Sequence, residues 1–237
     1  MSELEENIKI DFISNMQDIY LEVYKISNQY LEDYYYDLKR RRTIDIRGIV
    51  NKYGIDIVER EIYPSGFLFV NQIDGYLDII NKDNDNKYTI YVNENLDEVY
   101  KRYVIAHEFS HYMLKKIYKN NSQKKKGMEI KYCLNVLFAK NVEENVCDIL
   151  TSFLLMPIDC VLPLMKQFVD DKKDCYPVRV SEWLQCLSYW MQISSYHVGL
   201  CFQHIRYLAA FIYDNENKGL GDRIPIKNIK EYEYLFY

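Results

Sequence analysis

The chain has 237 residues, of which 49% are hydrophobic and 27% charged, and its formal net charge is −5. This is ordinary globular composition, so a disordered, collagen-like or fibrous chain is excluded. The acidic charge gives no overall attraction for nucleic acid. No stretch reaches the roughly 18 consecutive apolar residues of a membrane helix, and Met1–Glu6 is acidic with no apolar signal region after it. We therefore expect no membrane partner and a cytoplasmic location.

The first half of the chain predicts helices and then strands. Apolar residues three and four positions apart predict a long helix over 8–38. A short helix over 46–52 ends before Gly54, which suits a helix C-terminus. Alternating apolar residues then predict a small antiparallel sheet, with strands at 55–58, 66–70, 75–80 and 88–92.

From residue 96 the pattern becomes helical. A helix is predicted over 96–118, with Asn95 and Glu98 in the positions of a capping box. Around Val104–Ala106 this helix is apolar nearly all round, so we expect it to be central and buried. Further helices are predicted over 142–155, 159–168, 181–191 and 195–208. The predicted fold class is α+β, with a small antiparallel sheet packed on the central helix and a helical C-terminal part.

The central helix carries the motif His-Glu-x-x-His at His107–His111. Residues four apart on a helix are separated by about 40° around its axis, so both imidazoles project from one face and can share a metal ion. Glu108 stands beside the first histidine, where it can act as a base toward water activated by the metal. The chain has only 4 histidines, so chance produces this pattern in about one such chain in 200. Without a metal, the same side chains in an apolar helix would leave buried polar groups unsatisfied.

The next predicted helix can supply a third ligand. Glu144 and Asp148 are four apart and share a face, so one can bind the metal and the other can accept the outer N–H of a histidine ligand. Glu143 points about 100° away from Glu144, so we interpret it as a solvated or structural residue. His197 and His204 lie far downstream, and ordinary packing is their default interpretation. Zinc suits two histidines and a carboxylate, although manganese or iron can use the same ligands.

These residues resemble a known family. The segments Ala106–His111 (Ala-His-Glu-Phe-Ser-His), Glu144–Asp148 (Glu-Asn-Val-Cys-Asp) and Leu154–Pro157 (Leu-Leu-Met-Pro) are similar to the ImmA/IrrE family of zinc-dependent metallopeptidases. The similarity extends over roughly residues 45–208. Small departures from the family pattern, such as Ser110 in place of glycine, leave the metal-binding residue types intact.

The resemblance implies one Zn²⁺ per chain, held by His107, His111 and Glu144, with Glu108 as the catalytic base or acid. Asp148 is then the carboxylate that orients a histidine ligand. The resemblance also implies a cytoplasmic protease of bacteria, phages or other mobile elements. Its protein substrate would be a helix-turn-helix transcriptional repressor.

We therefore predict a zinc-dependent endopeptidase that hydrolyses a peptide bond with metal-activated water. The alternative is a metal-bound regulatory or partner-binding protein with little or no protease activity. Glu108 favours the enzyme, because a binding protein needs no base beside its metal. Direct nucleic-acid binding is not expected, because the helix pair predicted near 187–204 holds few cations.

We divide the chain into an N-terminal helical extension (1–43), a metallopeptidase core (44–168) and a helical C-terminal part (169–237) with a helix-turn-helix-like pair. The C-terminal part is expected to form one compact unit with the core. The N-terminal helix allows two interpretations, an ordinary packing helix or a partner-binding extension.

Overall fold

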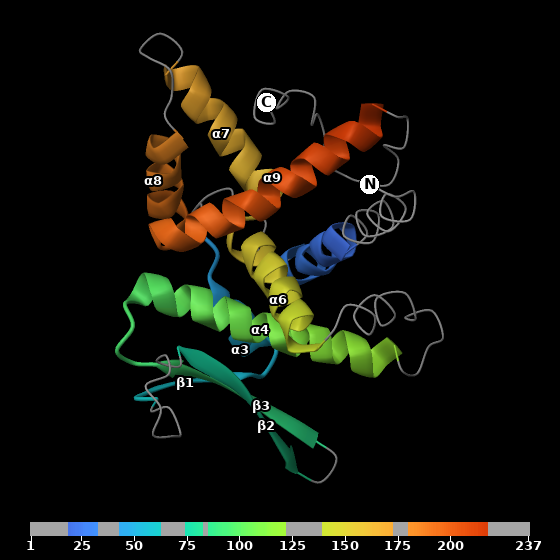
Figure 1. Ribbon diagram of the computed structural model, residues 1–237. Helices are drawn as coiled ribbons and strands as arrows, with labels where there is room; N and C mark the ends of the chain where they lie inside the picture. Colours follow the sequence, from blue (N-terminus) through green and yellow to red (C-terminus); the bar gives the residue numbers. More distant parts are fainter. Residues whose placement is uncertain are drawn as a thin grey trace, which may run out of the picture.

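The computed structural model describes residues 19–32, 43–62, 74–82, 85–121, 139–172 and 180–217. A helix covers residues 19–31. The elements that follow are α3 (Ile46–Lys52), β1 (Asp56–Arg60), β2 (Gly75–Lys82), β3 (Asp85–Asn93), α4 (Glu98–Asn121), α6 (Ala139–Leu155), α7 (Ile158–Lys172), α8 (Val180–Met191) and α9 (Ser195–Asn217). The α+β class is confirmed (Figure 1). The strand predicted at 66–70 lies outside the described residues.

The three described strands form one sheet in the order β1-β3-β2. As predicted, β2 pairs with β3 in antiparallel orientation, with Leu77 opposite Ile90. The antiparallel prediction is wrong for β1, which pairs with β3 in parallel orientation, with Ile57 opposite Ile90. A parallel pair needs a long crossover connection. Residues 61–84, which include the outer strand β2, provide that length between β1 and β3.

Helix α4 lies between the sheet and α6 (Figure 1). Its N-terminus is capped by Asp97, whose Oδ1 accepts a hydrogen bond of 2.8 Å from the backbone N–H of Tyr100. The predicted cap, Asn95, instead lies in the preceding turn, where its N–H donates to Oδ1 of Asn93 at 3.1 Å. The capping-box prediction is therefore wrong, because the turn places Asp97 at the helix boundary.

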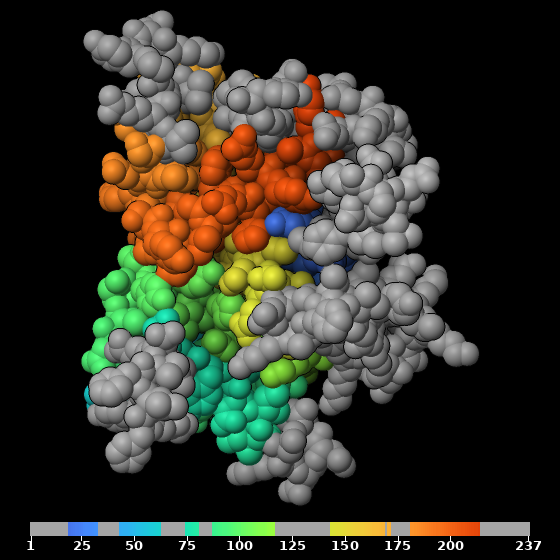
Figure 2. All heavy atoms as spheres, viewed as in Figure 1, coloured from blue at the N-terminus to red at the C-terminus, as the bar shows by residue number. Residues whose placement is uncertain are grey.

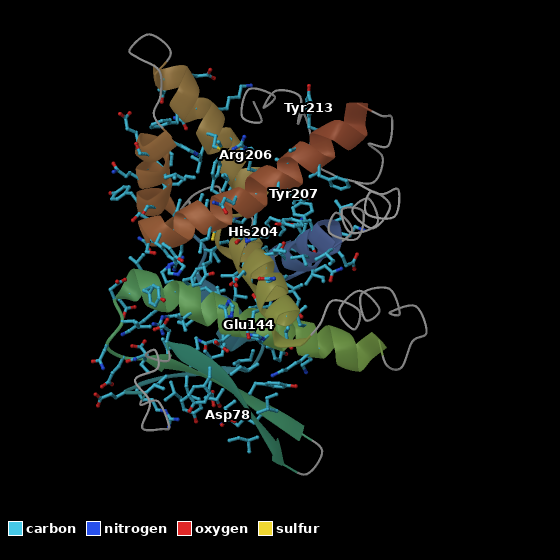
Figure 3. The ribbon with its side chains drawn as sticks, in the orientation of Figure 1. Asp78, Glu144, His204, Arg206, Tyr207 and Tyr213 are labelled. Atoms are coloured by element: carbon cyan, nitrogen blue, oxygen red, sulfur yellow. The ribbon has the colours of Figure 1, made fainter. Side chains whose placement is uncertain are left out.

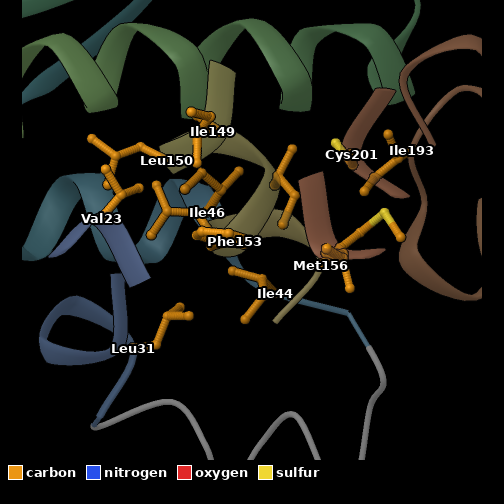
Figure 4. Close-up of a cluster of buried hydrophobic side chains, with 14 of the residues drawn as sticks. Val23, Leu31, Ile44, Ile46, Ile149, Leu150, Phe153, Met156, Ile193 and Cys201 are labelled. Atoms are coloured by element: carbon orange, nitrogen blue, oxygen red, sulfur yellow. The ribbon is translucent and has the colours of Figure 1, made fainter. Parts of the chain in front are cut away.

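The hydrophobic core connects the sheet, α4, α6 and the C-terminal helices. Phe109 of α4 and Phe153 of α6 are almost completely buried, and Figure 4 shows Phe153 among aliphatic side chains from several helices. The helix over 19–31 belongs to this core. Its Tyr20 and Tyr24 rings meet the Phe153 ring edge-on, with centroids 6.2 and 6.1 Å apart. Within the described residues, the predicted N-terminal helix therefore packs against the core. The predicted domain boundaries remain predictions.

Helices α6 and α7 meet at a bend before Pro157. A residue that precedes proline avoids the helical conformation, and α6 accordingly ends at Leu155. None of the described helices combines the length and the hydropathy of a membrane-spanning helix. By length and composition alone, one pair of segments would be long and apolar enough together, namely Glu143–Leu155 and Ile158–Phe168, which are bent by 60° relative to one another.

Gly75 stands at a close approach between β2 and α4. A Cβ at this position would lie 2.4 Å from Cγ1 of Val104 and 2.8 Å from the carbonyl oxygen of Tyr91. We expect Gly75→Ala to lower the free energy of unfolding by about 1–3 kcal/mol, because the backbone oxygen cannot move without disturbing β3. Urea unfolding measures this loss.

The matched control for this prediction is Gly199→Ala in α9. Among the described residues, no heavy atom outside the neighbouring residues and the helix's own backbone lies within 4 Å of the added Cβ at this helical position. Alanine is favoured over glycine in a helix interior by about 1 kcal/mol, so this variant should be at least as stable as the wild type. An equal loss of stability in both variants would count against a steric role for Gly75.

Candidate metal site

The structure brings His107 and His111 of α4 against Glu144 of α6. Figure 3 shows Glu144 where these two helices cross. Nε2 of His107 lies 3.1 Å from Oε2 of Glu144, and Nε2 of His111 lies 3.6 Å from the same oxygen. One ligand atom from each of the three residues lies within 4.8 Å of the other two. The i, i+4 spacing on α4 therefore has the geometric consequence that the sequence predicts.

The other ring nitrogen of each histidine also faces a carboxylate. Nδ1 of His107 lies 3.1 Å from Oδ1 of Asp148, the residue predicted for such a contact. Nδ1 of His111 lies 3.0 Å from Oε1 of Glu143. This second contact is not predicted from the sequence, because Glu143 lies about 100° around the helix from Glu144 and is therefore expected to point away from the site. His111 stands one turn along α4 from His107, and this places its Nδ1 within reach of Glu143.

The imidazoles are deep and the carboxylates are near solvent. The His107 and His111 side chains are 18% and 13% exposed, whereas those of Glu143, Glu144 and Asp148 are 42–45% exposed. On the face in Figure 2, β2, α4 and α6 adjoin below α9. Water can therefore reach the acidic side of the site.

The charge of the site suits a cation. Carboxylates of Glu108, Glu143, Glu144 and Asp148 surround two imidazoles. Burial lowers the pKa of His107, but interactions with Asp148, Glu108 and Glu144 outweigh it, and the pKa is raised overall. When both Nδ1 atoms donate to carboxylates, both Nε2 lone pairs point toward Glu144 Oε2. These acceptor atoms repel one another unless a proton or a metal ion lies between them. The residues present therefore fit a divalent metal ion.

Glu108 lies between the histidines and the sheet. Its carboxylate accepts a hydrogen bond from the backbone N–H of Leu77 in β2. Burial raises the pKa of the Glu108 carboxyl, and the nearby His111 and His107 offset this only partly. A carboxyl group with a raised pKa is suited to exchange protons near neutral pH.

The two downstream histidines have packing roles, as expected. The ring of His197 is 4% exposed and stacks on Tyr103 with a centroid distance of 3.8 Å. Nδ1 of His204 lies 2.6 Å from the hydroxyl of Tyr20. Burial lowers the pKa of both histidines. Among the described residues, neither belongs to a group that could hold a metal ion.

Tyr103 is a further residue near the site that sequence reasoning missed. Its hydroxyl donates to Oδ1 of Asp148 at 3.2 Å. Burial raises the pKa of Asp148, but the nearby His107 and the hydrogen bond from Tyr103 outweigh it, and the pKa is lowered overall. The available signal was the spacing, because Tyr103 precedes His107 by four residues and shares its helix face.

Comparison with protein families agrees with this geometry. The family model Peptidase_M78, described as the IrrE N-terminal-like domain, matches residues 50–185, more than half of the chain. The matched segment contains His107, His111 and Glu144. A comparison with curated proteins found no match. The predicted resemblance is confirmed, and the chain belongs to the Peptidase_M78 metallopeptidase family of IrrE N-terminal-like domains.

Proposed function

We propose that this metallopeptidase is a zinc-dependent endopeptidase that binds one Zn²⁺ through His107, His111 and Glu144. The observation that carries the proposal is the convergence of three ligand atoms within 4.8 Å, beside the buried carboxyl group of Glu108. Two imidazole nitrogens and one carboxylate are a common ligand set of catalytic zinc, which keeps a fourth position open. A bound Zn²⁺ lowers the pKa of coordinated water to about 7 and polarises carbonyl oxygens.

Glu108 is the proposed general base. Its carboxylate takes a proton from the attacking water and can then pass it to the leaving amine. The hydrogen bond from Leu77 fixes the orientation of this carboxylate, and burial keeps its proton affinity high enough for both transfers. Asp148 and Glu143 hold the outer nitrogens of the two histidines, so that each Nε2 is directed to the metal.

The proposed substrate is a protein chain in extended conformation. In the described sheet β2 is an outer strand, and its Leu77 contacts Glu108 directly. A peptide that pairs with an outer strand gains backbone hydrogen bonds and is held straight. Such a peptide would lie beside the candidate metal site. The identity of the substrate as a helix-turn-helix repressor rests on the family resemblance, and the cytoplasmic location stays a prediction.

The proposal is tested in two stages. Elemental mass spectrometry should find near one zinc per chain in the wild type and almost none in His107→Ala. The wild type is then incubated with the helix-turn-helix protein encoded nearest to its gene, and mass spectrometry identifies the products. A cut made by the wild type and not by Glu108→Gln supports the endopeptidase. If zinc is bound stoichiometrically but neither the helix-turn-helix protein nor unfolded test proteins are cleaved, the regulatory alternative is favoured. Absence of bound zinc would overturn the proposal.

A further inference from the structure

The Asp148 carboxylate contacts two residues of α4. The Tyr103 hydroxyl donates to Oδ1 of Asp148 at 3.2 Å, and the same oxygen lies 3.1 Å from Nδ1 of His107. Tyr103 and His107 are one helical turn apart on α4. One carboxylate oxygen of α6 therefore contacts two successive turns of the helix that carries the histidines.

The orientation of this carboxylate matters to His107. In the described part of the chain, Nδ1 of His107 is buried and has no hydrogen bond of good geometry, despite its distance of 3.1 Å from Asp148. Hydrogen bonds weaken steeply with angle, so the orientation of the Asp148 carboxylate decides how well it can hold Nδ1 of His107. A residue that limits this orientation therefore acts on His107.

Tyr103 is itself held from a third helix. The His197 ring stacks on the Tyr103 ring at 3.8 Å with an interplanar angle of 24°. Nδ1 of His197 lies 2.6 Å from Oγ of Ser194, and the same hydroxyl accepts the backbone N–H of His197 at 3.3 Å. Ser194 immediately precedes α9, so the start of that helix fixes the stacking ring.

We propose that Tyr103 is a positioning residue for the metal site, which fixes the Asp148 carboxylate beside Nδ1 of His107. The His107 ring is then held with its Nε2 atom toward Glu144 and the metal. This inference rests on the proposed function, since it assigns Tyr103 a role toward the same zinc ion. Changes to the partners of metal-binding histidines lower metal affinity by about 10- to 100-fold. Because Tyr103 acts on His107 only through Asp148, we expect the loss of zinc affinity to be near the lower value.

The test compares two tyrosines of the same helix. Tyr103→Phe removes only the hydroxyl and leaves the ring to stack on His197. Tyr100→Phe is the matched control, because its hydroxyl donates to Asp74 at 2.7 Å and its ring also lies near His197, at 4.8 Å. Competition with a chelator should show that Tyr103→Phe binds Zn²⁺ about 10-fold more weakly than the wild type, and that Tyr100→Phe binds it equally well.

Two further measurements separate positioning from general loss of structure. Nitrogen NMR of the zinc-free protein should give the same His107 ring signals in the wild type and in Tyr100→Phe, and altered His107 signals in Tyr103→Phe. In the Asp148→Ala background, Tyr103→Phe should cause no additional loss of zinc affinity. If its effect persists there, or if Tyr103→Phe and Tyr100→Phe behave alike, the inference is overturned and the proposed function stands. A wild type that binds no zinc overturns both.

Discussion

Replacement of Glu108 by glutamine is expected to lower kcat for peptide hydrolysis by about 100- to 10,000-fold while the zinc content stays at the wild-type level. The amide cannot take a proton from water, but it has nearly the same shape and its oxygen can still accept the N–H of Leu77. Steady-state kinetics on a cleavable peptide, together with elemental mass spectrometry of the same sample, measures both effects.

Glu98→Gln is the control for this experiment. Glu98 belongs to the same helix, but its side chain is 71% exposed and pairs with Lys101, away from the histidines. Its loss should leave both kcat and zinc content unchanged. The Glu108 variant should also be no less stable than the wild type, because burial disfavours the charged carboxylate that the substitution removes. Hydrolysis by Glu108→Gln within a few-fold of the wild type would assign the base to another residue.

The helical half of the site is predictable from the sequence because its geometry is local. His107 and His111 share a face of any α-helix, and Glu144 and Asp148 share a face of the next one. These relations need no knowledge of the partner element. The end of α3 is also predictable. Gly54 follows this helix with φ of 70°, a conformation that glycine adopts without steric cost.

The remaining contacts depend on how elements meet, and spacing along the chain does not determine this. Glu143 reaches His111 only because α4 and α6 cross at one particular position. The parallel pairing of β1 likewise depends on β2 taking the outer position in the sheet. Asn95 and Asp97 are both good capping residues, and the turn at Asn93 decided between them. Tertiary geometry, rather than residue type, supplied the missing information in each case.

Glu144→Ala is expected to remove almost all bound zinc, whereas Glu143→Ala should keep the metal with an affinity lower by about 10-fold. Glu144 places one oxygen near Nε2 of both histidines, so its loss takes away a ligand. Glu143 contacts the outer nitrogen of His111, so its loss affects the orientation of a ligand that stays in place. Zinc content after dialysis and chelator competition measure the two variants side by side.

The comparison is informative because the two residues are matched in almost every other respect. They are neighbours on α6, their side chains are 43% and 45% exposed, and each substitution removes one negative charge. General electrostatic attraction for a cation and changes in helix stability therefore affect both variants alike. A difference between them isolates direct coordination. Equal zinc content in Glu144→Ala and the wild type would place the third ligand elsewhere, with Asp148 or Glu143 as the next candidates.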